Sequence, residues 1–377
     1  KAAIAPLGSL LRLLGAKAWI KYQPKGTVGI ISPWNFPFQL AIAPMAGILS
    51  AGNRIMLKPS EFTPSSSELT KNMINEYFDE TEIAVFTGDP SIGAAFSSLA
   101  FDHLLFTGGT EIAKHVMKAA AENLVPLTLE LGGKSPTFIF KDCDIKLTAK
   151  RIVWAKFLNA GQTCIAPDYL LVEKEIKEQL LAALKTEIEL AYPLSNTINE
   201  NYVQIINDTH FQRLTNLILK DKIYFGGEQN ASERIIHPTL LQNISFEDLI
   251  MKEEIFGPLL PVISFDNLDD VISKVKKKEK PLALYIYSKN KKIINKILSE
   301  ISFGGGAINE SLVHLSNPNL PFGGVGASGI GSYHSKAGFD TFTHYKSILH
   351  KSFLFEPNIK YLPFTKLKRR ILKMLLE

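Results

Sequence analysis

Short apolar runs alternate along the chain with longer stretches in which apolar residues recur every three or four positions. This rhythm predicts repeated strand–helix units. In the first third of the chain, the predicted strands are Val28–Ile31, Arg54–Leu57, Glu82–Phe86 and His103–Phe106. Helices are expected over Phe38–Ala51, from a serine cap near Ser65, and through Ile112 and Val116. Such alternation is typical of a doubly wound parallel sheet.

The same pattern returns after Gly133. Strands are predicted at Thr137–Phe140, Tyr169–Val172, Ile223–Phe225, Leu259–Ser264 and Leu282–Tyr287. Helices are predicted over Thr148–Phe157 and Ile176–Tyr192. The expected fold class is therefore α/β, with two doubly wound lobes.

Length and composition are those of an ordinary globular protein. A chain of 377 residues exceeds the usual size of one hydrophobic core, so two domains are expected. Hydrophobic residues make up 46% and charged residues 21% of the sequence. The net charge of +5 comes from mostly dispersed basic residues, which does not indicate nucleic-acid binding. No uncharged apolar stretch reaches about 18 residues, the length that a membrane-spanning helix needs.

Positive charge is concentrated in two stretches, Lys274–Lys280, which is expected to be a solvated helix end, and the C-terminal Lys366–Lys373. Basic residues and leucines alternate in the second stretch at roughly helical spacing. Such a helix could lie on an anionic membrane surface. The interpretation that we favour from sequence is an amphipathic tail packed on its own or a partner subunit.

The two cysteines, Cys143 and Cys164, belong to no CxxC pattern. Because the chain is neither small nor rich in cysteine, structural disulfides are not expected and a reducing, cytoplasmic location fits best. The eight histidines lack metal-ligand spacing, so no metal site is predicted.

Cys164 and Glu130 form a candidate catalytic pair. A thiol can form a thioester with a carbonyl substrate, and a carboxylate can activate the water that releases it. A lone cysteine is usually inert core filler, so Cys164 gains interest only from the segments around it.

A loop with two prolines, Ser32–Pro37, follows the first predicted strand and carries Asn35. A rigidly held Asn35 amide could donate a hydrogen bond to the oxyanion formed when a thiolate attacks an aldehyde. An isolated asparagine in a loop more often only shapes the turn.

Two further segments follow predicted strands at the edge where open α/β sheets bind nucleotides. Lys58 and Glu61 could hydrogen-bond a ribose, although this segment could equally be a helix entry. Thr107-Gly108-Gly109-Thr110 offers free N–H groups for a pyrophosphate at a helix N-terminus, a weak signal by itself.

A third segment, Glu254–Pro258, precedes a predicted strand of the second lobe. The carboxylate of Glu254 could hold a ribose diol, and the ring of Phe256 could pack on a flat cofactor. A surface helix end explains this segment equally well.

Taken in order, these segments resemble the aldehyde dehydrogenase superfamily from about Tyr22 to about Lys346. The motifs are Pro33-Trp34-Asn35, Lys58-Pro59-Ser60-Glu61, Phe106-Thr107-Gly108, Glu130-Leu131-Gly132-Gly133-Lys134, Gly161-Gln162-Thr163-Cys164, Glu254-Ile255-Phe256-Gly257-Pro258 and Pro321-Phe322-Gly323-Gly324. The residues that follow Cys164, and Gly331–His334, resemble the class 3, fatty aldehyde and coniferyl aldehyde dehydrogenase branch.

The resemblance implies oxidation of an aldehyde to a carboxylic acid with NAD or NADP. It implies Cys164 as the nucleophile, Asn35 as an oxyanion donor and Glu130 as the base for hydrolysis. The residues that it implies for cofactor binding are Ser32, Trp34, Lys58, Glu61, Thr107, Gly108, Gly109, Leu131, Glu254 and Phe256. Many relatives have serine where Gly109 stands. Glu61 would repel the 2′-phosphate of NADP and Lys58 could accept it, so the choice between the two cofactors stays open.

The resemblance also implies a Rossmann-like cofactor domain over 1–129, a catalytic domain over 130–341 and a C-terminal oligomerisation or tail segment over 342–377. Within the first, 10–24 would form an oligomerisation hairpin. The branch implies a homodimer, and the family's N-terminal helices are expected to be missing from a shortened chain.

The substrate is open from sequence. Four bulky residues near the motifs suggest an apolar entrance for medium-chain or aromatic aldehydes: Phe36, Phe38, Trp154 and Phe157. Two other functions stay open, a thiol hydrolase that uses Cys164 and Glu130 without a cofactor, and a catalytically silent interaction protein.

Overall fold

The computed structural model describes residues 2–4, 15–193, 202–353 and 356–376. The chain divides into two compact units. The hairpin unit contains residues 1–24 and 343–377, and the main unit contains residues 25–342. The predicted α/β class is confirmed, because both large sheets of the main unit are mostly parallel.

The first sheet of the main unit has six strands in the order β17-β7-β6-β3-β4-β5. These strands are β3 (Thr27–Ile31), β4 (Arg54–Lys58), β5 (Ile83–Val85), β6 (His103–Thr107), β7 (Leu127–Glu130) and β17 (Gly329–Ile330). All pair in parallel except β17, which runs antiparallel to β7. Strand β17 joins this sheet from within the predicted catalytic segment 130–341.

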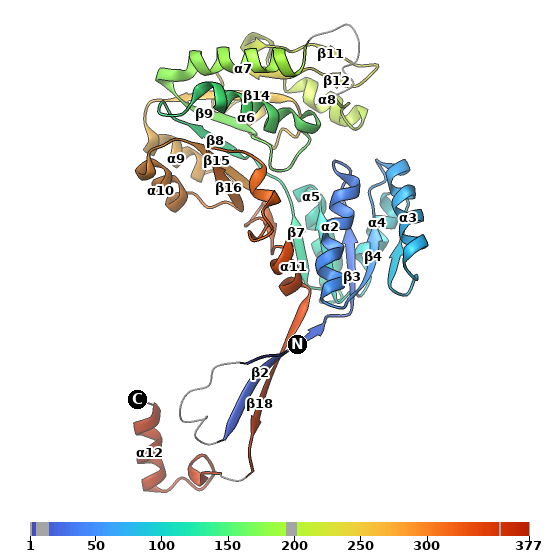
Figure 1. Ribbon diagram of the computed structural model, residues 1–377, viewed down its shortest axis with the longest axis vertical. Helices are drawn as coiled ribbons and strands as arrows, with labels where there is room; N and C mark the ends of the chain where they lie inside the picture. The colour runs from blue at the N-terminus through green and yellow to red at the C-terminus, as the bar shows by residue number, and fades with distance from the viewer. Residues whose placement is uncertain (1, 5–14, 194–201, 354–355, 377) are drawn as a thin grey trace. The chain divides into compact units, whose positions relative to one another are not determined.

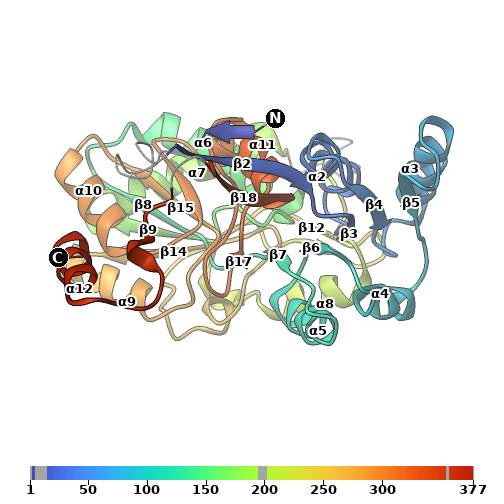
Figure 2. The ribbon, with the colours of Figure 1, turned by 90° about the horizontal axis from the view of Figure 1, so that it is seen from below.

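Helices cover both faces of the six-stranded sheet (Figure 2). They are α2 (Pro37–Ser50), α3 (Pro64–Tyr77), α4 (Pro90–Ser97) and α5 (Thr110–Ala121). Buried residues of α2 and α3 pack with Val28 and Ile30, whereas those of α4 and α5 pack with Leu104 and Phe106. This is the doubly wound arrangement predicted from the alternation of strands and helices.

The direction of winding reverses between β3 and β6. Strands β4 and β5 lie on one side of β3, and strands β6 and β7 lie on its other side. Open α/β sheets bind ligands beyond the carboxyl ends of the strands at such a point. The residues that follow β3 and β6 therefore lie where a nucleotide is expected.

The second sheet of the main unit has seven strands in the order β10-β13-β14-β9-β8-β15-β16. These are β8 (Pro136–Ile139), β9 (Tyr169–Glu173), β10 (Ile223–Phe225), β13 (Thr239–Leu241), β14 (Leu259–Phe265), β15 (Ala283–Tyr287) and β16 (Gly305–Ile308). Only β10, at one edge, is antiparallel to its neighbour.

Figure 1 shows α6 (Ile145–Phe157) and α7 (Lys177–Ala191) on one side of this sheet and α9 (Leu268–Lys276) and α10 (Lys291–Glu300) on the other. Alternate residues of β8 pack into the two cores on opposite faces of this sheet. Ile139 packs with α6 and α7, and Phe138 packs with α9 and α10. Phe157 is buried in the first of these cores, so it is not part of a substrate entrance.

The remaining elements of the main unit are short. They are α8 (Asp208–Asn216), α11 (Ser335–Thr341), the strand pair β11 (Gln229–Asn230) and β12 (Ile235–Ile236), and the 3-10 turns η1 (Leu158–Gly161), η2 (Lys174–Ile176), η3 (Lys220–Lys222), η4 (Leu249–Met251) and η5 (Val313–Ser316).

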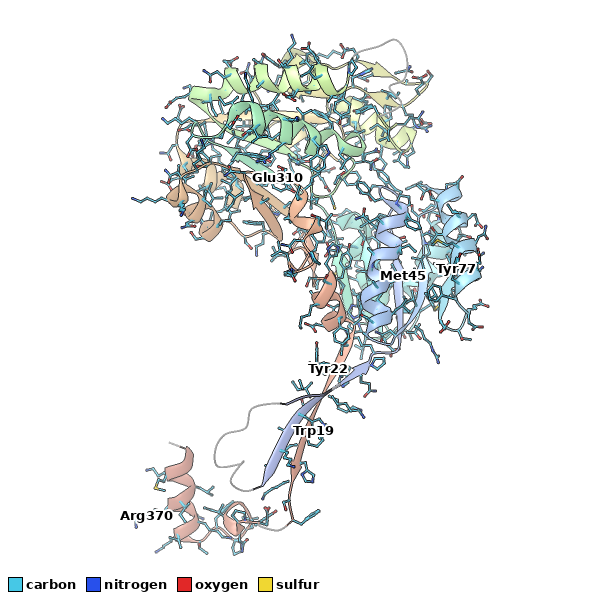
Figure 3. All side chains as sticks on the ribbon, viewed as in Figure 1. Trp19, Tyr22, Met45, Tyr77, Glu310 and Arg370 are labelled. Carbon is cyan, nitrogen blue, oxygen red and sulfur yellow. The ribbon has the colours of Figure 1, made fainter. Side chains whose placement is uncertain are left out.

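The hairpin unit contains a three-stranded antiparallel sheet in the order β1-β2-β18. Its elements are β1 (Ala2–Ile4), β2 (Ala16–Pro24), β18 (Thr343–Lys351), the turn η6 (Asn358–Lys360) and helix α12 (Lys366–Leu376). Figure 3 labels Trp19 and Tyr22 on β2. Part of the predicted hairpin over 10–24 lies outside the described residues, and the described part is a single strand that pairs with β18.

Two predicted helix starts are wrong. Helix α3 begins at Pro64 after Thr63, not at a serine cap near Ser65, because a proline is well suited to the first helical position. Helix α6 begins at Ile145, one turn before the predicted Thr148, because the Asp144 carboxylate accepts a hydrogen bond from the Leu147 N–H.

Helix length and hydropathy bear on membrane insertion. In the part of the chain that the structure describes, no helix is both long and apolar enough to cross a membrane.

Candidate active site

The loop before Cys164 has an unusual backbone. Asn159, Ala160 and Gly161 all have positive φ angles, of 53°, 52° and 73°. Residues other than glycine seldom adopt this region, and strained backbone often occurs at functional sites. A Cβ atom at Gly161 would collide with the carbonyl oxygen of Gly257. The loop therefore requires glycine at position 161.

Gln162 fixes this loop from within the protein. Its side-chain amide donates to the carbonyl oxygens of Asn159 and Gln204, each at 3.1 Å. Its side-chain oxygen accepts from the Ile206 N–H at 3.0 Å. Because Gln162 is buried, these bonds satisfy an amide that would otherwise be costly to bury.

Asn35 reaches the same loop from the first lobe. Its amide nitrogen donates to the Gln162 carbonyl at 3.0 Å, and its own carbonyl accepts from the Asn159 amide at 2.8 Å. An asparagine amide carries two N–H groups, so the second remains available to an oxyanion formed at Cys164. The predicted meeting of Asn35 with the cysteine loop is therefore present in the structure.

The Cys164 thiol is half-buried and is not in a disulfide. Burial raises its pKa above the usual range, and the charges of Glu254 and Glu130 raise it further. The next residue is held in place by the Tyr285 hydroxyl, which donates to the Ile165 carbonyl at 2.7 Å. The thiol therefore lies in a rigid loop close to two carboxylates.

Glu130 ends β7 and is 2% exposed. Neither of its carboxylate oxygens has a hydrogen-bond partner among the described residues. Burial holds the pKa of this carboxyl well above its usual range. A buried carboxyl group without protein partners needs a proton or a bound water, which suits a residue that activates water.

Glu254 lies on the loop before β14, close to the glycines that follow β7. A Cβ atom at Gly132 would collide with its carboxylate, and the Gly133 N–H donates to it. Burial, reinforced by the charge of Asp168, raises the pKa of Glu254 to about 8. The predicted Glu254 and Glu130 segments therefore meet beside Cys164.

A buried ion pair holds the loop that carries Glu254. Lys134 pairs with Asp168 and also donates to the carbonyls of Ile250 and Glu253, both at 2.8 Å. The other Asp168 oxygen accepts from the Ile255 N–H at 2.9 Å.

Arg213 on α8 supports the same loop from its other side. It donates to the Ile255 carbonyl at 2.6 Å and to the Glu254 carbonyl at 3.4 Å. Burial lowers the pKa of Arg213 from its usual value, partly offset by the charge of Glu254.

Phe256, next on this loop, faces Trp34 of the first lobe. Their ring centroids are 5.3 Å apart in an edge-to-face arrangement, and the centroid of the His210 ring lies 5.5 Å from that of Trp34. Phe256 also has a positive φ of 47°, which is rare for an aromatic residue. The aromatic part of the predicted cofactor set is thus brought together.

The ends of β3 and β4 carry polar groups suited to a ribose. Lys58 is buried and forms a 2.7 Å ion pair with the partly exposed Glu61. The Ser32 N–H donates to the Lys58 carbonyl at 3.1 Å, and the Ser32 hydroxyl is buried without a partner among the described residues. An orphaned hydroxyl beside a lysine–carboxylate pair fits the hydroxyl groups of a nucleotide.

The start of α5 leaves room for a phosphate. Thr107 ends β6, the Gly108 N–H donates to the Glu130 carbonyl at 3.0 Å, and Gly109 precedes the first helical turn. A Cβ atom at Gly109 would meet nothing within 4 Å, so a serine also fits there. Leu131 is instead buried in the core with α5, and its N–H donates to the Ser328 carbonyl.

Several residues near Cys164 were not predicted to act there. Lys134 ends the Glu130–Lys134 motif and Asp168 follows Cys164 by four positions, but neither was predicted to act, and Arg213 has no local sequence signal. Lys156 is fully buried, and burial lowers its pKa to about 8 while the Asp168 charge opposes that shift. Burial holds the pKa of Tyr333 above its usual range, with contributions from Glu130 and Cys164.

Comparison with known families gives one match along most of the chain. The model of the aldehyde dehydrogenase family matches residues 8–348.

Three curated relatives cover most of the chain. It is 45% identical to the 4,4'-diaponeurosporen-aldehyde dehydrogenase of Staphylococcus aureus, over 94% of this chain and 78% of that protein. It is 44% identical to the dimeric NADP-preferring aldehyde dehydrogenase of Rattus norvegicus, over 90% and 75%. It is 45% identical to the coniferyl aldehyde dehydrogenase of a Pseudomonas species, over 92% and 74%.

A solved structure agrees with the fold. The substrate-bound AldH of Staphylococcus aureus superposes with a TM-score of 0.95 at 43% identity. That match covers 100% of this chain and 82% of the other.

Proposed function

Since the chain belongs to the aldehyde dehydrogenase family, which oxidises aldehydes to carboxylic acids with NAD or NADP, we propose that Cys164 and Glu130 carry out the covalent steps of this reaction. The observation that carries the proposal is the buried Glu130 carboxyl, which has no partner among the described residues and whose charge acts on the Cys164 thiol.

In the first step, the Cys164 sulfur attacks the aldehyde carbon and forms a thiohemiacetal. Because burial and two carboxylates disfavour the thiolate, the thiol proton leaves to solvent water as the bond between sulfur and carbon forms. The negative charge that develops on the aldehyde oxygen is stabilised by the free N–H of Asn35 and by the Cys164 N–H.

The cofactor fits the edge of the first sheet. Lys58 and Glu61 would hold the adenosine ribose beside the Ser32 hydroxyl, and Thr107, Gly108 and Gly109 would line the phosphates. Glu254 would hold the second ribose, with Phe256 and Trp34 beside the nicotinamide. When bound, NAD or NADP accepts the hydride that leaves the substrate carbon. The buried Leu131 side chain supports this cleft through the core rather than as a polar contact.

In the last step, the thioester on Cys164 is hydrolysed. Glu130 takes a proton from water, the resulting hydroxide attacks the thioester carbon, and the Cys164 sulfur departs as the carboxylic acid is released. The rigid loop around Gly161 and Gln162 keeps the thioester within reach of Glu130.

Medium-chain aliphatic or aromatic aldehydes are the proposed substrates. Phe38 and Trp154 expose large apolar surfaces on α2 and α6, which suits an apolar substrate. The relative named for coniferyl aldehyde supports an aromatic substrate.

A homodimer is the proposed assembly. The proposed domains are a cofactor domain over 1–129, a catalytic domain over 130–341 and a C-terminal segment over 342–377. Residues 10–24 and 342–377 would form the oligomerisation element. Among the described strands, β18 lies at one edge of the hairpin unit's sheet, and edge strands can pair with a strand of another chain. The rat relative is named as dimeric. Two free cysteines support a cytoplasmic location.

Reduction of NAD or NADP by the protein and an aldehyde tests the chemistry. Cys164→Ala is expected to abolish the rise in reduced-cofactor absorbance, whereas Cys143→Ala, the matched control, leaves it unchanged. An active Cys164→Ala protein would exclude the covalent mechanism. Ester hydrolysis through Cys164 with no binding of either cofactor would favour the thiol hydrolase instead.

A further inference from the structure

Tyr333 is a buried residue beside the candidate site that the proposed reaction does not use. Its side chain is 3% exposed, and it lies on the segment between β17 and α11. Gly329 of β17 is the register partner of Glu130 on β7. The chain therefore passes beside the proposed base shortly before it reaches Tyr333.

The backbone at Tyr333 is held in place by its neighbours. Its N–H donates to the Phe322 carbonyl at 3.2 Å. A Cβ atom at Gly338 would lie 2.1 Å from the Tyr333 carbonyl oxygen, so α11 packs directly against this carbonyl. Helix α11 in turn lies against α2, where a Cβ atom at Gly47 would lie 3.2 Å from Gly338 (Figure 1). These contacts fix the point from which the Tyr333 side chain extends.

Two other rings border the ring of Tyr333. The centroid of Phe322 is 6.3 Å away and that of His334 is 4.6 Å away, both in edge-to-face arrangements. Tyr333 and Phe322 also belong to the same buried hydrophobic cluster. A phenylalanine would fill this space equally well, so packing does not account for the hydroxyl group.

The Tyr333 hydroxyl lies within the electrostatic reach of the proposed catalytic pair. The charges that act on it are those of Glu130 and Cys164, and burial holds its pKa well above the usual range. Buried tyrosine hydroxyls usually find a partner, as that of Tyr202 does at the Ile236 carbonyl, 2.9 Å away. No hydrogen bond joins the Tyr333 hydroxyl to a group of the described chain.

Glu130 and Tyr333 therefore bring unpaired polar atoms to the same buried place. Buried polar groups in native proteins are satisfied by protein groups or by water. An ionised carboxylate only accepts hydrogen bonds, whereas a tyrosine hydroxyl can both donate and accept. One water can thus donate one of its protons to Glu130 and the other to the Tyr333 oxygen. Its lone pairs are then left for the carbon bound to Cys164.

We propose that the Tyr333 hydroxyl holds the hydrolytic water together with Glu130. This inference rests on the proposed function and assigns a further residue to its last step. With both water protons held, a lone pair of the water oxygen is directed to the thioester carbon on Cys164.

The step balances without any further reactant. Glu130 takes one proton from the water as the bond between oxygen and carbon forms. The bond between carbon and sulfur then breaks, its electron pair returns to the Cys164 sulfur, and the proton held by Glu130 passes to that sulfur. The products are the carboxylic acid, the free thiol and the Glu130 carboxylate, and Tyr333 keeps its own proton throughout.

Single turnovers of the whole protein test the proposal with Tyr333→Phe. With protein and NAD or NADP in excess over benzaldehyde or hexanal, the rise in reduced-cofactor absorbance gives the rate of thioester formation. The mass of acid-quenched protein gives the rate of thioester decay. We expect formation at the rate of the unchanged protein and decay slowed about tenfold, the effect of one lost hydrogen bond.

Hydroxylamine separates an effect on the water from an effect on the packing around Cys164. Its nitrogen attacks the thioester carbon without a general base and releases a hydroxamic acid and the thiol. In Tyr333→Phe, added hydroxylamine should therefore remove the thioester as fast as it does in the unchanged protein.

Tyr287→Phe is the matched control. Tyr287 is 1% exposed, and its hydroxyl forms a 2.8 Å hydrogen bond with the Ser311 hydroxyl. Both variants lose one buried hydroxyl group, but the charges that act on Tyr287 are those of Glu310, Arg151 and Cys143. Thioester decay in Tyr287→Phe should equal that of the unchanged protein.

Three results would overturn the proposal. They are thioester decay in Tyr333→Phe at the unchanged rate, equal slowing of thioester formation and decay, and slow removal of its thioester by hydroxylamine. The second and third results would assign Tyr333 to the packing around Cys164. If the unchanged protein forms no thioester with either aldehyde, the proposed function itself is wrong, and the assignment of Tyr333 is rejected with it.

Discussion

At the scale of single residues, the candidate site is dominated by carboxyl groups in low-polarity surroundings. Glu130 and Glu254 both act on the Cys164 thiol, and burial raises the pKa of all three groups. Each group is therefore held closer to its neutral form than it would be in water. A site of this kind favours proton transfer during the reaction over a permanent thiolate.

Glu130→Gln is expected to separate the two halves of the reaction. Gln has nearly the shape of Glu but cannot accept a proton from water, so the thioester should form and persist. Rapid mixing should show one burst of reduced cofactor per active site, followed by a steady rate about 10²- to 10⁴-fold lower. A steady rate equal to that of the unchanged protein would remove Glu130 from the hydrolytic step.

The raised pKa of Glu254 predicts a pH-dependent stability. The folded protein favours neutral Glu254, whose pKa is about 8, whereas in the unfolded chain this carboxyl ionises at its usual pKa of 4.5. This contribution is complete below pH 4.5 and is lost as pH rises towards about 8.

Urea unfolding across that window measures the effect. Glu254→Gln, which cannot ionise, should lose less unfolding free energy with rising pH than the unchanged protein, by more than about 1 kcal/mol. Parallel curves for the two proteins would mean that Glu254 is ionised in the folded state.

Sequence motifs found Asn35 and Glu130 because these residues lie at or just after the carboxyl ends of parallel strands. Cys164 follows α6 and η1 instead, and it was found by its local motif. Asn35, Glu130 and Cys164 could be named without knowing their contacts. Arg213 could not, because its two bonds to the Glu254 loop join residues about 41 positions apart and leave no local pattern.

At the scale of elements, two loops shape the site, and each depends on one feature. The loop before Cys164 needs the left-handed backbone at Gly161, and the loop of Glu254 needs the Lys134–Asp168 pair. Helix propensity and hydrophobic period carry no information on either, because both are set by contacts between loops.

Gly161→Ala is expected to damage both stability and activity. A methyl group there would meet the Gly257 carbonyl and force alanine into positive φ, at a cost of about 1–3 kcal/mol or more. Gly109→Ser is the control, because that position is open, has φ −75°, and serine is a favourable helix cap. Thermal melting and the rate of cofactor reduction should both distinguish the two variants.

Lys134→Met should weaken cofactor use more than the chemical step. Losing the bonds to Asp168, Ile250 and Glu253 frees the loop that carries Glu254, so KM for NAD or NADP should rise by on the order of tenfold. A smaller change is expected in the burst rate at saturating cofactor.

Lys141→Met is the matched control for this loop, because Lys141 forms only exposed ion pairs with Glu173 and Glu175. Equal changes of KM in both variants, or a loss of folding without a change of KM in Lys134→Met, would show that the pair acts on stability alone.

Element boundaries show where local sequence patterns were sufficient. The strands at 28–31, 54–57, 103–106 and 169–172 were placed within a residue of their observed limits, because buried strands have short apolar runs. β17 was missed since Gly329–Ile330 is too short to show a period, and it is defined only by pairing with β7.

At the scale of the whole molecule, the two units have different tasks. The main unit contains every residue proposed for catalysis and cofactor binding, and the hairpin unit contains β18 and α12. Substitutions in the loops that carry Cys164 and Glu254 should therefore change the reaction.

Pairing of β2 with β18 also constrains the order in which the protein folds. The pair joins the two ends of the main unit, and Pro24 and Thr343 are register partners. Closing that loop while the main unit is unfolded costs roughly 5 kcal/mol of chain entropy, whereas a folded main unit already holds its ends together. In pulsed hydrogen exchange during refolding, the amides of β2 and β18 should therefore gain protection last, after both large sheets.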